Sequence, residues 1–467
     1  VVQQVRAAGV EPDRIICNAA ISACGKGGLW ALCLALLSDT SCLDAHTYLG
    51  SCGPGIVTYN AAIDACAVVG RWELTVQLLK DLRSISLEAN VVTCSSAMSA
   101  GEKGDQWMRT LQMLYSMQQE ELAPNTISFN SAISGCEKRA RWGYALHLLH
   151  GMLDGPRGIE PSLISHNAAI SACEKSGRWY WAIQLLTRIG QNDFLPDAVS
   201  YNAAIGACAQ ASDWERAFVL LSEMEHQRLR VGLISYGAAL NACAGGGQLP
   251  LALWAIEDMV RRRLQPDLPA YSSLVTACEK AERWETALEM LTSARHAKLQ
   301  PDVVAYSAAV SACGRCRQTG PTLALLNEMR RERCSPNTIT CNSALTACEG
   351  SADWVLALSL MEEMLGLKLR RDEITYSALI AVCGRGGQWE RSLIFLEEAR
   401  SDALPLDEIL YEAVVRACEV NMQWERIPGV MAELRSGALR GWGCAQVGTV
   451  PRPRRARRRL ALVGQKA

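Results

Sequence analysis

The 467-residue sequence lacks any apolar run of 18 residues, any marked excess of one charge, and all but four phenylalanines. Without a long apolar run, neither a membrane-spanning helix nor a membrane partner is expected. Lysine and arginine number 47 against 48 aspartates and glutamates, which excludes a uniformly basic surface for nucleic acid. No charged segment followed by an apolar one opens the chain at Val1, which leaves open whether a targeting segment precedes it.

Patterns typical of enzymes are missing as well. The six histidines are scattered, and no His-x-Glu with a downstream Pro-Cys-x-x-Cys occurs, which excludes a zinc-dependent deaminase. Cys313 and Cys316 have the spacing of a redox or half-zinc motif, but no second cysteine pair follows. We therefore expect no enzyme activity, no metal site and no cofactor.

What the sequence does contain is a repeat of about 35 residues marked by tryptophan. The recurring tryptophans are Trp72, Trp107, Trp142, Trp179, Trp214, Trp284, Trp354, Trp389 and Trp424. A fixed period of this length indicates an array of supersecondary units, each of which buries its apolar face against its neighbours. Since 49% of the residues are apolar and 20% are charged, we expect one folded, mostly helical domain.

Cysteine follows the same period. Eleven of the 20 cysteines recur at one place, namely Cys24, Cys66, Cys136, Cys173, Cys208, Cys243, Cys278, Cys313, Cys348, Cys383 and Cys418. Copies one repeat apart lie too far from each other for a disulfide, which needs Cα atoms within about 7 Å. The pattern therefore favours cysteine as a small core residue.

Each repeat is predicted to be a helical hairpin. In the best-formed repeat, residues 163–197, apolar residues such as Ile164 and Ala168 recur at helical spacing through the first half. Gly177 ends this helix, because glycine readily adopts the left-handed conformation that closes a helix. A second helix begins at Trp179 and has its own apolar stripe.

The repeats can be placed in one register, in which the position of a residue is counted from the start of its repeat. Ten repeats occupy residues 56–90, 91–125, 126–162, 163–197, 198–232, 233–267, 268–302, 303–337, 338–372 and 373–407. A degenerate repeat at 14–55 and a partial repeat at 408–442 flank them, so that the predicted solenoid spans residues 14–442. Residues 443–467 form a basic tail, for which we expect disorder.

Several further residues recur in this register, among them the opening pair Tyr59-Asn60, the pair Gly177-Arg178 before the second helix, and a late methionine such as Met224. With these residues the array resembles the pentatricopeptide repeat family, in its P-class-like form of 35-residue repeats. The tetratricopeptide repeat is the main rival, but its 34-residue signature places tryptophan in the first helix. The resemblance implies an all-α fold, a right-handed α-solenoid (superhelix) of helix-turn-helix pentatricopeptide repeats.

The same resemblance implies a single-stranded RNA partner, read at about one base per repeat by the fifth and last residues. The implied readout residues are Asn60, Asn90, Ser95, Asn125, Asn130, Ser162, Asn167, Asp197, Asn202, Asp267, Ser272, Asp302, Ser307, Asn337, Asn342, Asp372, Ser377 and Asp407. The family's pairing rules do not read Asn202 with Gly232 or Gly237 with Asp267 securely. The closing Asp and Asn residues are also good N-caps for the following helix, and both roles stay open.

The second residue of each repeat packs against the base faces in that family. These residues are Val57, Val92, Ile127, Ile164, Val199, Ile234, Val304, Ile339 and Ile374, with Pro269 as the exception. Second and fifth residues are three apart, so they share one face of the first helix. The alternative is that the second residues belong to the core.

A row of cations stands at the thirteenth position of the repeats. It comprises Lys26, Lys103, Lys138, Lys175, Lys280, Arg315 and Arg385. Such a row is suited to phosphate contacts, although cations at a helix C-terminus also stabilise the helix dipole.

We therefore expect a sequence-specific RNA-binding protein that acts by occupancy in RNA processing, stability or translation. The family resemblance implies a chloroplast or mitochondrial location, with other RNA-processing proteins as further candidate partners. The alternative function is a protein-binding helical-repeat scaffold.

Overall fold

The computed structural model describes residues 14–42, 55–85, 87–120, 122–154, 158–191, 194–402, 404 and 408–429. These residues form tandem helical hairpins and contain no β-strand, which confirms the predicted all-α solenoid class. None of the described helices is long and apolar enough to cross a membrane. Asp407, the tail 443–467 and the end of the partial repeat after Gly429 lie outside the described residues.

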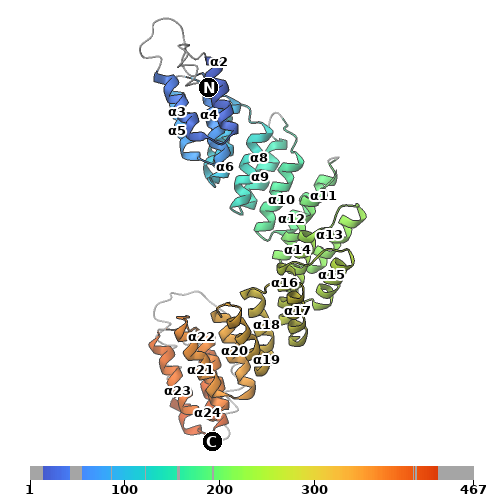
Figure 1. Cartoon of the computed structure of the whole chain (residues 1–467), viewed down its shortest axis with the longest axis vertical. Coiled ribbons are helices and arrows are strands. Elements are labelled where there is room, and N and C mark those ends of the chain that lie inside the picture. Colours follow the sequence, from blue (N-terminus) through green and yellow to red (C-terminus); the bar gives the residue numbers. More distant parts are fainter. Residues whose placement is uncertain are drawn as a thin grey trace. The chain divides into compact units, whose positions relative to one another are not determined.

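The chain divides into two bodies, one ending at Pro301 and one starting at Asp302, each built from hairpins in chain order (Figure 1). In the N-terminal body the first helices are α2 (Arg14–Lys26), α4 (Ile56–Val69), α6 (Val91–Lys103), α8 (Thr126–Lys138), α10 (Leu163–Lys175), α12 (Ala198–Gln210), α14 (Leu233–Gly246) and α16 (Leu268–Lys280). Their second helices are α3 (Trp30–Cys42), α5 (Trp72–Ser84), α7 (Trp107–Gln119), α9 (Trp142–Asp154), α11 (Trp179–Gln191), α13 (Trp214–His226), α15 (Leu249–Arg261) and α17 (Trp284–His296).

The C-terminal body continues the pattern. Its first helices are α18 (Val303–Arg315), α20 (Thr338–Ser351), α22 (Glu373–Arg385) and α24 (Glu408–Val420). Its second helices are α19 (Thr319–Arg331), α21 (Trp354–Gly366) and α23 (Trp389–Ser401), followed by the short 3₁₀ helix η2 (Trp424–Arg426). Within each body, a first helix packs against its own second helix and against the next first helix.

Small residues let the first helices approach one another. Ala172 and Cys173 are fully buried on α10, and the recurrent cysteines are buried on the other first helices from α4 to α24, except α6, where Gly101 takes that position. Burial raises the pKa of Cys173 and Cys208 to about 12, because a thiolate would lose its hydration in the core. The cysteines therefore stay protonated and fill the core, as their period predicts.

Tryptophan joins successive repeats at the start of the second helices. The Trp72 ring is half-buried, and the guanidinium of Arg109 from the next repeat lies 4.1 Å from its centroid. Arg216 covers Trp179 at 3.8 Å, and Trp354 is covered by an arginine of the next repeat in the same way. These cation–π contacts add to the apolar packing, and they give the 35-residue tryptophan period a structural role.

The turn between the two helices of a repeat uses a left-handed residue. Gly70, Gly177 and Gly387 have φ values of 75°, 64° and 78°, in agreement with the sequence-based expectation. Other repeats adopt the same conformation without glycine, as at Ala140 and Ala352, where φ is 54° in both cases. An alanine in this conformation is strained, because its Cβ approaches the following carbonyl oxygen.

Candidate functional site

The closing residue of a repeat is the N-cap of the next first helix. The side chain of Asp197 accepts a hydrogen bond from the backbone N–H of Ser200 at 2.8 Å, and Asp372 accepts one from Thr375 at 2.9 Å. The other capping residues are Asn90, Asn125, Ser162, Asp267, Asp302 and Asn337. The N-cap interpretation is therefore correct, and it fixes one oxygen of each closing side chain in place.

The same closing side chains also meet the fifth residues, 30 positions earlier or, for Asn130 and Ser162, 32 positions earlier. The Asn167 Nδ2 donates to Asp197 Oδ1 at 3.2 Å, and the Asn342 Nδ2 donates to both carboxylate oxygens of Asp372 at 2.9 and 3.1 Å. Further contacts join Asn60 to Asn90 at 3.4 Å, Ser95 to Asn125 at 3.2 Å and Asn130 to Ser162 at 3.5 Å. The structure thus brings together five of the pairs that the family resemblance implies.

Hydrogen bonding also sets the charge of these pairs. Burial by itself would raise the pKa of Asp197, but hydrogen bonds from the Ser200 backbone and hydroxyl and from the Asn167 amide outweigh it. The net effect holds the pKa below its usual range, so that Asp197 is an anion at neutral pH. The pair consequently offers a fixed acceptor beside a fixed amide donor.

The remaining readout residues are arranged differently. Ser307 and Asn337 do not bond directly, but each contacts the hydroxyl of Thr340, at 2.8 Å in both cases. Asp267 caps α16, and the fifth residue of its repeat, Gly237, has no side chain to bond to it. Ser272 and Asp302 lie in different bodies, while Ser377 donates to the carbonyl of Ile374 at 3.0 Å and its partner Asp407 lies outside the described residues.

The second residues form a row of exposed aliphatic side chains. Their exposed fractions run from 57% at Val92 to 72% at Ile234, and the row comprises Val57, Val92, Ile127, Ile164, Val199, Ile234, Val304, Ile339 and Ile374. The alternative that these are core residues is wrong. An isolated exposed aliphatic is ordinary, but nearly every repeat exposes one at the same position, so the side chains form a regular apolar row on the surface.

The fifth residues lie beside this row but deeper. Asn342 is 6% exposed, whereas Ile339 on the same helix is 64% exposed. Because residue 342 bonds to the third residue of the next repeat, it lies between the exposed second residues of two repeats. The five repeats with a bonded pair therefore present a polar pair at the base of an apolar rim, an arrangement suited to a flat ring with polar edges.

The thirteenth-position cations contact the preceding repeat. Lys138 donates to the carbonyl oxygen of Glu102 at 2.9 Å, and Lys175 forms an ion pair with Glu137 at 3.0 Å. Arg385 pairs with Glu349 at 3.0 Å, and Lys280 donates to the carbonyl of Gly245 at 2.7 Å. Lys103 and Arg315 hold the same position on α6 and α18, and the Lys26 side chain is outside the described part. The carboxylate partners partly neutralise the cation row.

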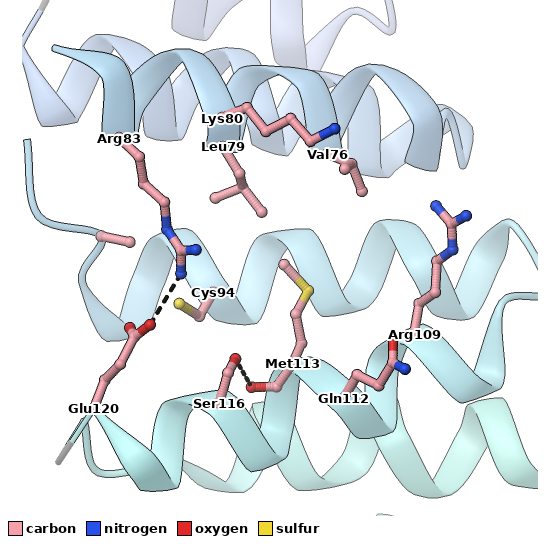
Figure 2. A pocket seen from close by; sticks show the side chains of 11 residues that line it. Val76, Leu79, Lys80, Arg83, Cys94, Arg109, Gln112, Met113, Ser116 and Glu120 are labelled. Carbon is pink, nitrogen blue, oxygen red and sulfur yellow. Dashed lines mark hydrogen bonds and ion pairs between the residues drawn. The ribbon is translucent and has the colours of Figure 1, made fainter.

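A groove on the second helices offers a different kind of site (Figure 2). It lies between α5 and α7, where Lys80, Arg83 and Arg109 surround an apolar floor that includes Cys94. Arg83 pairs with Glu120 at 3.0 Å. Burial, and to a smaller extent Glu120, raises the pKa of Cys94, which favours the protonated thiol at neutral pH.

Sequence comparison identifies the repeats. The family profile described as "Pentatricopeptide repeat domain" matches residues 77–139, 255–316 and 324–386, and that described as "PPR repeat" matches residues 57–87, 199–229, 304–334 and 374–402. Together the matches cover more than half of the chain. The chain belongs to the pentatricopeptide repeat family.

Solved structures show the same fold. The chain is similar to the pentatricopeptide repeat protein PPR10 in complex with an 18-nt psaJ RNA element, with a TM-score of 0.58 and 19% identity over 93% of this chain and 75% of that chain. PPR10 from maize gives a TM-score of 0.53 at the same identity and coverage. Comparison with curated protein sequences gives no match.

Proposed function

We propose that this protein binds one segment of single-stranded RNA along the first helices, at about one base per repeat. The observation that carries the proposal is the row of exposed second residues beside the buried polar pairs, because it repeats an apolar rim and a hydrogen-bonding group at the same place in each repeat. Family membership and the RNA bound to the similar PPR10 structure support it.

The proposed action is occupancy rather than catalysis. A protein that lies along an RNA segment blocks nucleases, prevents base pairing or exposes a neighbouring site, and none of these effects needs a reactive group. Family membership favours a chloroplast or a mitochondrion as the compartment, and RNA processing, stability or translation as the process. Other RNA-processing proteins are further candidate partners.

The cation row has a secondary part in this proposal. Lys138 and Lys175 have side chains that are 39% and 43% exposed, so their ammonium groups can still face a phosphate. Eight residues of helix separate the fifth and thirteenth positions, which is a rise of about 12 Å. The cations would then follow the RNA backbone while the fifth residues contact the bases.

The proposal is tested by removing one member of the aliphatic row. We expect Ile339→Ser to weaken binding to a random single-stranded RNA pool about fivefold, because part of the apolar contact with a base is lost. The matched control is Val355→Ser, at the corresponding N-terminal position of α21 and 58% exposed against 64% for Ile339. Equal effects of the two substitutions would contradict the proposal. It would also be contradicted if the wild-type protein bound no RNA from the pool.

A failed RNA assay would favour a protein-binding scaffold instead. The second helices carry exposed aromatic residues, among them Tyr144, Tyr180 and Trp254, at 54%, 52% and 43% exposure. Such residues are common in protein interfaces. The scaffold alternative would be weakened if the protein bound RNA specifically and substitutions of these aromatic residues left that binding unchanged.

A further inference from the structure

In most repeats the third residue carries a hydroxyl that contacts the fifth residue of the repeat before it. The Ser235 hydroxyl donates to Asn202 Oδ1 at 2.6 Å, and Thr375 donates to Asn342 Oδ1 at 2.7 Å. The same bond joins Thr93 to Asn60, Ser165 to Asn130 and Ser200 to Asn167, each at 2.5 Å. This contact belongs to neither the aliphatic row nor the fifth and closing pairs.

The direction of the bond follows from the other contact of the hydroxyl. The Ser235 Oγ lies 3.4 Å from the backbone nitrogen of Gly232 and accepts a hydrogen bond from its N–H. The hydroxyl proton is therefore left to be donated, and only the oxygen of the Asn202 amide can accept it. This fixes the rotation of the amide, with Oδ1 turned toward Ser235 and the NH₂ group left to meet a ligand.

The sequence pattern matches this role. Every asparagine at the fifth position is followed by serine or threonine at the next third position. The exceptions at the third position are Ala270, Ala305 and Leu410, and they follow Gly237, Ser272 and Ser377. Glycine has no amide to orient, and the two serines already donate to backbone carbonyls of their own helices at 3.0 Å. The hydroxyl is thus present wherever there is an amide to fix.

One repeat depends on this hydroxyl more than the others do. Asn167 and Asn342 are also held by the carboxylates of their closing aspartates. Asn202 is closed by Gly232, which has no side chain, and within the described part of the chain its side chain has one hydrogen bond, the one from Ser235. A Cβ added at Gly232 would have no atom within 4 Å, so the space beside Asn202 is open.

We propose that Ser235 is the positioning residue for base readout by Asn202, and that it supplies the constraint that a closing side chain supplies in other repeats. The repeat closed by Gly232 then presents a fixed amide donor and selects a base edge with an acceptor. This inference rests on the proposed RNA binding. It predicts a base preference for the repeat 198–232, for which the family's pairing rules give no secure assignment.

The test uses the tightest-binding RNA recovered from a random pool and its single-base variants. Asn202→Gly identifies the nucleotide that this repeat reads, as the one at which base discrimination is lost. At that nucleotide we expect Ser235→Ala to lower the ratio of best to worst affinity at least fivefold, because a freed amide presents either its oxygen or its NH₂ group. Ser235→Thr should retain the ratio, since Thr93, Thr340 and Thr375 are fully buried at equivalent places.

Ser200→Ala is the matched control for the loss of a capping hydroxyl. This substitution removes the equivalent hydroxyl one repeat earlier, but the Asp197 carboxylate still accepts a hydrogen bond from Asn167. The ratio of best to worst affinity at the neighbouring nucleotide should therefore change less than twofold. Unchanged discrimination in Ser235→Ala, at a nucleotide where Asn202→Gly abolishes it, would overturn the inference. If the wild-type protein showed no base preference, the proposed function itself would fail, and the two failures are therefore distinguishable.

Discussion

At the scale of the residue, single polar side chains have two tasks. Asp197 caps α12 through Ser200 and also accepts a hydrogen bond from Asn167, so that it contributes to helix stability and to the polar pair of its repeat. An N-cap is worth about 1 kcal/mol, which by itself explains an Asp or Asn at the closing position. Capping does not explain Asn at the fifth position, because asparagine is a poor residue for the interior of a helix.

One buried histidine is expected to make stability depend on pH. His166 is 1% exposed, where most other repeats have Tyr or Phe, and within the described residues its Nε2 has no hydrogen-bond partner. Burial lowers the pKa of His166; a hydrogen bond to the Ser162 carbonyl opposes this and the charge of Arg188 adds to it. In the unfolded chain the pKa is near its usual value of about 6.5.

The unfolded state therefore takes up a proton at a higher pH than the folded state. The wild-type protein should lose stability as pH falls below about 6.5 toward the folded pKa, by at most about 1.4 kcal/mol per pH unit from this group. His166→Phe should remove this part of the dependence, since Phe129 is buried at the same repeat position. Urea unfolding at pH 7.5 and 5.5 measures both proteins. Equal losses for the two would show that His166 does not carry the effect.

At the scale of the element, the hairpin is the unit that the sequence predicts well. The tryptophan period, the left-handed Gly177 and the start of the second helix at Trp179 all follow from local rules of helix formation and termination. The exposure of the second residues was harder to predict, because Val and Ile at helical spacing are equally compatible with a core. The hydroxyl contacts of residues such as Ser235 were missed, because they join residues 33 apart.

The cation row shows the same limit. Its period is visible in the sequence, but its pairing with Glu137 or Glu349 depends on how neighbouring helices are set side by side.

For the third residues, the available signal in the sequence was a capping-box pattern, with a polar residue three positions before Ser or Thr. This pattern predicts the helix cap, but it does not predict the hydrogen bond from the third residue to the fifth residue of the preceding repeat.

The strained turns give a prediction at this scale. Ala352 ends α20 with φ at 54°, where Gly70 and Gly387 serve in other repeats. We expect Ala352→Gly to stabilise the protein by about 0.5 kcal/mol or more, because glycine avoids the clash of Cβ in this conformation. Ala324→Gly, at an exposed position within α19, should destabilise it by about 1 kcal/mol. Chemical denaturation measures both, and a loss of stability in both variants would contradict the strain.

At the scale of the whole molecule, affinity cannot come from bulk charge. The chain has 47 basic and 48 acidic residues, so attraction to RNA must arise from local contacts summed over the repeats. The aliphatic rim recurs in both bodies, and under the proposed binding mode this repetition would make the effect of one residue assignable to one nucleotide. A surface for a folded protein partner would not have this property.

The most direct test of base-by-base reading is selection from a random single-stranded RNA pool with the wild-type protein and with Asn342→Ser, followed by sequencing of the bound RNA. The wild-type protein should enrich a sequence in register with the repeats, and Asn342→Ser should change the preferred base at one position only. Binding at two salt concentrations should give a slope of about −0.7 for each phosphate contact. An absence of enrichment, or the same preferences in both proteins, would contradict the account.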